Sequence, residues 1–169
     1  MKRILFPIVS LFVVLVFTGC AGLISSNYKA ADDLYDKHKL DKGTSLVIAT
    51  VVNINNLEKS TTLGRTISEH VSSKFTDLGM NIVEMKLRDN IYIKSRTGEL
   101  VLSREINKLA KDIKADVIIA GTYSNAFNSV YVNLKIIDLK SNVILSTIDY
   151  ELSKDDNIRG LLNEEITKW

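Results

Sequence analysis

Leu46-Val-Ile-Ala-Thr-Val-Val-Asn-Ile54 is the stretch that decides the fold of this 169-residue chain. It is almost continuously apolar and rich in β-branched side chains, which is typical of a strand buried on both faces of a sheet. A polar loop over 55–62 follows it. The stretch therefore predicts a strand in the interior of a parallel or mixed sheet.

The segment after this loop has helical periodicity. Apolar side chains recur every three to four residues, at Leu63, Ile67, Val71, Phe75 and Leu78. This spacing predicts an amphipathic helix of about four turns, with Thr61 or Thr62 capping its start and Gly79 at its end. Met80 to Met85 is a second strand. Strand, helix and strand with short loops predict a βαβ unit, which requires a parallel strand pair and a right-handed crossover.

The second half of the chain has the pattern of an antiparallel meander. Val117 to Tyr123 is a strand with an apolar start, and in 130–136 apolar residues alternate with polar ones, as in a strand that is half exposed. Lys140-Ser-Asn142 forms a turn, and 143–152 returns antiparallel. We expect a single α/β domain with a mixed sheet of about five strands, a parallel βαβ half followed by an antiparallel meander, and packed helices.

Helices are also expected at the two ends and in the middle of this domain. One covers Tyr28 to Leu40, and Ser103 caps another whose apolar face runs from Ile106 to Ile113, after a short strand at 91–93. The final helix has an apolar stripe of Ile158, Leu161, Leu162 and Ile166, with Trp169 on the same side. It either packs on the exposed face of its own sheet or docks onto a neighbouring copy or another protein. In the docking case, deleting 157–169 leaves a folded domain.

The N-terminus is expected to be removed. Lys2 and Arg3 precede an apolar run from Ile4 to Phe17, too short for a transmembrane helix. Residues 1–19 are therefore an export signal, and no later segment is apolar for long enough to span a membrane.

Cys20, the only cysteine, directly follows the small residues of the expected cleavage site. Phe17-Thr-Gly-Cys20 resembles the lipobox of bacterial lipoproteins, in which the cysteine sulfur receives a lipid. The alternative is an ordinary signal peptide with a chance cysteine. Lipidation, with acyl chains such as palmitate, makes 20–27 a lipidated tether and 28–169 the folded domain. By the same resemblance, Ala21 favours the outer membrane, since an Asp there would favour retention in the inner membrane.

Charge excludes two classes of partner. Loss of Lys2 and Arg3 with the signal leaves 20 basic and 20 acidic residues and a formal net charge of zero. No segment is a basic block, so the chain lacks the electrostatic signature of nucleic-acid binding and of attraction to anionic lipid heads.

Several short motifs resemble one family when they are taken together. They are Ala49-Thr-Val-Val-Asn-Ile-Asn-Asn-Leu57, Leu63-Gly-Arg65 with Glu69, Gly98-Glu-Leu-Val-Leu-Ser-Arg-Glu105, Gly121-Thr-Tyr-Ser124 and Asp138-Leu-Lys-Ser-Asn-Val-Ile-Leu145. In this order they resemble the FlgO family of outer-membrane lipoproteins connected with the bacterial flagellum, over about 28–152. Asn142 stands where the family usually has a glycine. The domain type is also similar to the N-terminal domain of TolB and to curli-secretion lipoproteins.

The resemblance implies a periplasm-facing envelope lipoprotein that supports flagellar assembly or motility. It implies flagellar envelope components as partners, with a homo-oligomer as a further expectation, and no catalytic activity. Apart from the covalent lipid on Cys20, no cofactor is expected.

The residues themselves give little support to catalysis. His38 and His70 are the only histidines, and neither has the ligand spacing of a zinc site. No Gly-x-Ser-x-Gly motif, Walker motif or dinucleotide pattern occurs. We therefore expect neither an enzyme nor a metal site.

One ligand site stays open as an alternative. Asn53 and Asn55 follow the carboxyl end of the first strand, Thr62 and Arg65 begin the next helix, and Arg104 opens a later one. Crevices at this place in α/β sheets bind ligands, and helix N-termini attract anions. The sequence therefore leaves two interpretations, an assembly lipoprotein acting through protein contacts and a periplasmic ligand-binding or sensor lipoprotein.

Overall fold

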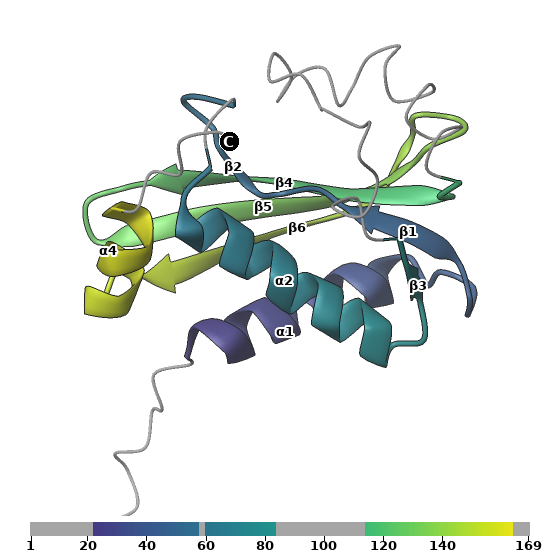
Figure 1. Ribbon diagram of the computed structural model, residues 1–169, viewed down its shortest axis with the longest axis horizontal. Helices are drawn as coiled ribbons and strands as arrows, with labels where there is room; N and C mark the ends of the chain where they lie inside the picture. Colours follow the sequence, from purple (N-terminus) through teal and green to yellow (C-terminus); the bar gives the residue numbers. More distant parts are fainter. Residues whose placement is uncertain (1–21, 58–59, 84–113, 164–169) are drawn as a thin grey trace, which may run out of the picture.

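The computed structural model describes residues 22–57, 60–83 and 114–163 (Figure 1). Its elements, in chain order, are α1 (Leu23–Lys37), β1 (Ser45–Ile48), β2 (Val52–Asn53), α2 (Thr62–Asp77), β3 (Asn81–Ile82), β4 (Val117–Asn125), β5 (Ser129–Asp138), β6 (Ile144–Ser153) and α4 (Asp156–Asn163). The expected strand at 91–93, the helix after Ser103, Cys20, Arg104 and Trp169 lie outside the described residues.

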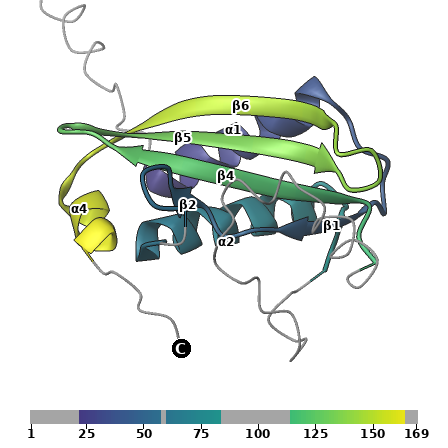
Figure 2. The same cartoon turned by 90° about the horizontal axis from the view of Figure 1, so that it is seen from above.

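The sheet is mixed, as predicted. Its strand order is β3-β1-β4-β5-β6. Strand β2 pairs with the same edge of β4 as β1 does, further along β4. The pairs β1–β3, β1–β4 and β2–β4 are parallel, whereas β4, β5 and β6 form an antiparallel meander (Figure 2). The α/β class and the parallel and antiparallel halves are confirmed, with six strands among the described residues against the expected five.

The predicted strand at 46–54 is interrupted. Ile48 pairs with Ile119 and Val52 pairs with Thr122. The three residues 49–51 therefore lie opposite only two residues of β4, 120 and 121, and the strand bulges at Val51. The Val51 N–H donates to Ser68 Oγ at 2.9 Å, and Ser60 Oγ donates to the Val51 carbonyl at 2.8 Å. Side chains thus replace the missing ladder bonds, because the start of α2 lies against this backbone.

Gly64 explains how α2 comes so near. A Cβ atom at this position would lie 2.1 Å from the carbonyl oxygen of Val51. Any other residue would collide with the strand backbone, so glycine permits the contact between the helix and the bulge. Apolar periodicity alone does not reveal such a contact.

The ends of α2 are close to their predicted positions. Thr61 occupies the N-cap position, but its hydroxyl makes no capping bond and instead accepts a hydrogen bond from Tyr123 Oη at 3.1 Å. At the other end Gly79 has φ +87°, and the N–H of Met80 donates to the Phe75 carbonyl. This is the predicted glycine C-cap.

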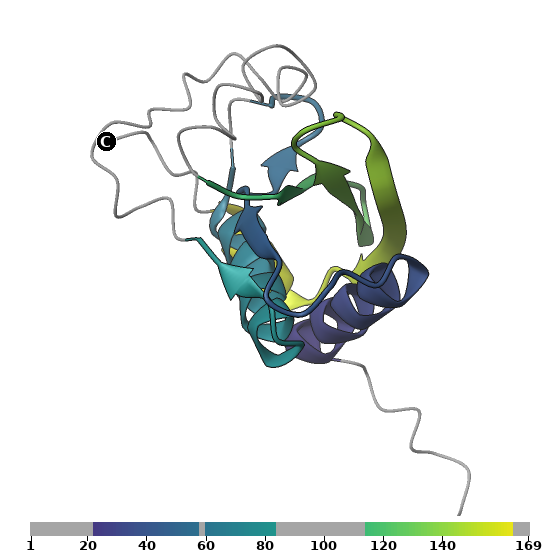
Figure 3. The same ribbon diagram turned by 90° about the vertical axis from the view of Figure 1, so that its right-hand side faces the viewer.

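The main core lies between α1, α2 and one face of the sheet (Figure 3). Leu34 of α1 and Ile67, Val71 and Phe75 of α2 are fully buried there. The sheet contributes the alternating apolar side chains of β5, Val130, Val132, Leu134 and Ile136. We call this side of the sheet the covered face.

The expected tether is shorter than predicted. Helix α1 begins at Leu23, with Gly22 as its N-cap, so 23–27 belong to the helix and not to an extended tether. Asn27 is fully buried in this segment. Polar residues such as Ser25 and Ser26 weaken the local helix preference, but packing against α2 and β6 outweighs it.

The final helix also differs from the expectation. Helix α4 packs beside α2, and its Ile158 and Leu162 are buried in the main core. The predicted position on the exposed face of the sheet is therefore wrong. Ile158 and Leu162 of the apolar stripe are already buried in the domain's own core. We therefore expect the domain to need this segment for its stability.

Candidate interaction face

The side of the sheet away from α1 and α2 changes character along its strands. Near β1 it is apolar, where Val47, Ile118, Ile137 and Leu139 form a second buried cluster. Toward the carboxyl end of β4 it becomes polar and accessible. We call this second part the open face, and it consists of Thr122, Ser124, Tyr131, Asn133, Lys135, Thr147, Asp149 and Glu151.

Strand register arranges these side chains in rows across the sheet. Ser124 pairs with Tyr131, which pairs with Glu151. In the adjacent row Thr122 pairs with Asn133, which pairs with Asp149. Antiparallel partners of this kind bring their Cβ atoms to within about 4.5–5.5 Å of each other.

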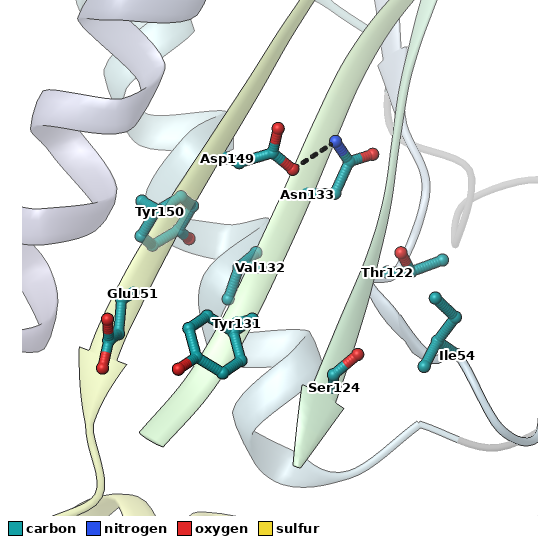
Figure 4. Close-up of a pocket in the computed structure, with 9 residues that line it drawn as sticks. All are labelled: Ile54, Thr122, Ser124, Tyr131, Val132, Asn133, Asp149, Tyr150 and Glu151. Atoms are coloured by element: carbon teal, nitrogen blue, oxygen red, sulfur yellow. Dashed lines mark hydrogen bonds between the residues drawn. The ribbon is translucent and has the colours of Figure 1, made fainter. Parts of the chain in front are cut away.

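These rows enclose an open concavity of about 450 Å³ (Figure 4). Its lining residues are Ile54, Thr122, Ser124, Tyr131, Val132, Asn133, Asp149, Tyr150 and Glu151. Ile54 joins the row of Ser124 because its N–H donates to the Tyr123 carbonyl at 3.0 Å. The site therefore depends on residues from three separate parts of the chain.

Hydrogen bonds orient the two carboxylates of the concavity. Asn133 Nδ2 donates to Asp149 Oδ1 at 2.8 Å and to Thr147 Oγ1 at 3.2 Å. Ser129 Oγ donates to Glu151 Oε1. Two acidic side chains line the concavity, and no lysine or arginine is among its described lining residues. The surface can thus bind cationic or hydrogen-bond-donating groups.

The predicted crevice after the first strand only partly assembles. Asn53 Oδ1 accepts a hydrogen bond from the Asn55 N–H at 2.9 Å, which stabilises the turn after β2. Asn55 and Arg65 are exposed, and Thr62 is half-buried at the start of α2. Arg104 lies outside the described residues. Binding at this crevice stays a prediction, whereas Asn53 has a local structural role.

A polar cluster between α1, α2 and β6 was not predicted. Tyr150 Oη donates to Asn27 Oδ1 at 2.6 Å, and Asn27 Nδ2 lies 2.9 Å from His70 Nδ1. Burial lowers the pKa of His70, and burial also raises the pKa of Tyr150. One signal was present in the sequence, because Asn27 has helical spacing with Ala30, Ala31 and Leu34 and so lies on the apolar face of α1.

Neither a metal centre nor a membrane span is found in 22–57, 60–83 and 114–163. No group of three or more His, Cys, Asp or Glu side chains lies close enough there to hold a metal ion. None of the helices in these ranges has the length and apolar character needed to cross a bilayer. His38, the second histidine, is exposed.

Comparisons with known proteins point to one family and one fold. Residues 28–157 match the family described as FlgO protein. The C-terminal domain of LpoB from Salmonella enterica has a TM-score of 0.62 at 11% identity, over 78% of this chain and 98% of that one. The same domain from Escherichia coli gives 0.60 at 12% identity, again over 78% and 98%. At this identity the likeness shows the fold alone. No curated protein matches the chain.

Proposed function

Since this chain belongs to the FlgO protein family, we propose that it is a lipid-anchored factor that supports flagellar assembly and motility through protein contacts. The family consists of outer-membrane lipoproteins with a protein-interaction role. The observation that supports this proposal is the extent of the family match, because 28–157 includes every described strand, most of α1 and all of α2. The family match supports an outer-membrane lipoprotein that acts through protein contacts, and the flagellar role is proposed in addition.

Anchoring is proposed to occur through acyl chains on Cys20. In the sequence, two residues, Ala21 and Gly22, separate this cysteine from the start of α1 at Leu23. At about 3.3–3.6 Å per extended residue, so short a connection spans roughly 10 Å. The domain is therefore held against its own membrane. From the family, we propose that it lies on the periplasmic side.

Action without catalysis is part of the same proposal. His70 has its Nδ1 beside the Asn27 amide and its ring edge-on to Tyr28, a structural environment. The accessible polar groups of the open face are an amide, hydroxyls, carboxylates and the ammonium group of Lys135 on a broad sheet surface, which suits contact with another protein. Partners are proposed to be flagellar envelope components.

The test is a Cys20→Ser variant expressed in a strain that lacks the native protein. Without a thiol to carry lipid, we expect a soluble periplasmic or uncleaved protein and a loss of swimming. Fractionation, motility in soft agar and copurification of the tagged wild-type protein with flagellar basal bodies are the measurements. Outer-membrane fractionation of the variant together with normal swimming refutes the anchoring.

The flagellar role has its own outcome. Swimming that is normal in a strain lacking the whole protein, with no copurification of the tagged form with basal bodies, refutes that role and leaves family membership intact. A Ser25→Ala variant, which changes an exposed residue near the start of α1 and keeps Cys20, is the matched control.

A further inference from the structure

We propose that the concavity on the open face binds a cationic segment of the protein partner, in which an arginine or lysine side chain stands next to an apolar one. The proposal rests on the proposed function, because it names the surface and the chemistry of the contact. Three observations carry it: exposed apolar side chains, carboxylates that form no ion pair with the described lysines and arginines, and the size of the concavity.

The apolar part of the concavity consists of two large side chains. Ile54 and Tyr131 are each 51% exposed and stand in the same row of the sheet, on either side of Ser124. Exposed tyrosines are frequent at the centres of protein–protein contacts. A tyrosine face also attracts the guanidinium group of arginine through its π-electrons.

The charged part of the concavity is acidic. Asp149 and Glu151 extend from alternate positions of β6 toward the side chains of β5. Lys135 lies one row further along β5, opposite Ala120 and Thr147, and is not among the lining residues. The carboxylates are therefore complementary to a cation supplied by a partner, and arginine can engage a carboxylate with two parallel hydrogen bonds.

The size of the concavity limits what it can bind. A volume of about 450 Å³ lies within the range of roughly 300–1,000 Å³ that is common for sites of small ligands. It accommodates a few side chains of a loop or an extended peptide. Saccharides also stack on aromatic rings, but the two carboxylates, which form no ion pair with the described lysines and arginines, favour a cation.

Fluorescence anisotropy with three labelled probes tests this chemistry on the full lipidated protein in detergent. The probes are a Leu-Arg-Leu-Arg-Leu peptide, a Leu-Glu-Leu-Glu-Leu peptide and a chitin trisaccharide. We expect saturable binding of the arginine peptide, weakened at high salt, and binding of neither other probe. Failure of the arginine peptide to bind, or preferential binding of the saccharide, overturns the proposal.

Matched variants locate the binding. Asp149→Asn with Glu151→Gln removes two charges from the concavity and is expected to weaken arginine-peptide binding at least tenfold. Asp36→Asn with Asp77→Asn removes two charges from exposed positions on α1 and α2 and is expected to leave it unchanged. Equal losses in both pairs would show nonspecific charge attraction and refute the site.

Swimming assays separate this proposal from the flagellar one. Asp149→Lys with Glu151→Lys is expected to abolish swimming while protein level and outer-membrane fractionation stay normal, and Asp36→Lys with Asp77→Lys is expected to swim. Normal swimming of the first variant, in a strain where loss of the whole protein stops swimming, refutes the concavity and leaves the proposed function standing. If loss of the whole protein has no effect on swimming, the proposed function fails. Binding at the concavity is then tested by the peptide titration alone.

Discussion

The two faces of the meander β4–β5–β6 differ in what they present, although the same strands form both. On the covered face, Val130, Val132, Leu134 and Ile136 of β5 are buried against the helices. Between them, Tyr131 and Asn133 point to the open face and line its concavity. A two-residue period thus assigns alternate positions of one strand to the core and to the surface.

This difference has an energetic consequence. Full burial of an aliphatic side chain contributes about 1.5–3 kcal/mol, so the covered face carries much of the stability of the domain. Half-exposed side chains contribute less to the stability of the fold, so these positions can carry residues that contact a partner. We therefore expect substitutions on the covered face to alter folding, and substitutions in the concavity of the open face to alter function without unfolding the chain.

The largest effect is expected from a charge on the covered face. Val71 is fully buried on α2, and Val71→Asp places an unpaired carboxylate in the core. We expect a loss of about 4 kcal/mol or more in the free energy of unfolding, measured by urea denaturation. Ser73→Asp, on the exposed side of the same helix, is the control and should cost less than about 1 kcal/mol. Similar free energies of unfolding for both variants would contradict the assignment of Val71 to the buried side of α2.

A smaller loss is expected at the C-terminal helix. Ile158 is buried in the core that α4 shares with α2, so Ile158→Ala should cost about 2–4 kcal/mol. Ile144→Ala, at an exposed position of β6, is the matched control. Deletion of 157–169 should destabilise the domain for the same reason, and circular dichroism with thermal melting of the truncated chain measures it. A truncated chain as stable as the full one would restore the docking interpretation of this helix.

A pH-dependent effect of smaller size is expected at His70. Burial lowers the pKa of His70 below 6.5, so the unfolded chain binds a proton more readily than the folded one. The stability from neutral His70 is therefore present above about pH 6.5 and is lost as the pH falls toward the folded pKa. His70→Gln can still accept the Asn27 hydrogen bond without titrating, so its denaturation midpoint should vary less between pH 7.5 and 5.5. His38→Gln, at an exposed position, should retain the wild-type dependence.

The smallest effect is expected at the loop after β2. Asn55 and Arg65 are both exposed, and the turn itself depends on the Asn53 side chain. Asn55→Ala with Arg65→Ala should leave the free energy of unfolding within about 1 kcal/mol and leave swimming nearly intact. Loss of swimming by this folded double variant would favour the ligand-binding interpretation over the assembly interpretation.

Much of the fold could be predicted because its signals are local. The spacing of Leu63, Ile67, Val71 and Phe75 is sufficient to predict α2 and its buried face. The alternation in 130–136 identifies the covered side of β5. Asn142, predicted in the hairpin turn, has φ +60° there. The interrupted strand, the early start of α1 and the position of α4 escaped prediction, since each depends on packing between distant segments.

The sequence by itself determined the α/β class, the parallel and antiparallel halves and the buried positions of α2 and β5, because periodicity and turn residues act over a few neighbouring positions. Only the tertiary structure decided the bulge at Val51 and the open face. The bulge depends on Gly64 lying against a backbone that precedes it in the chain. The concavity depends on a register that brings Ile54, Tyr131 and Glu151 together, and no local pattern encodes which strands become neighbours.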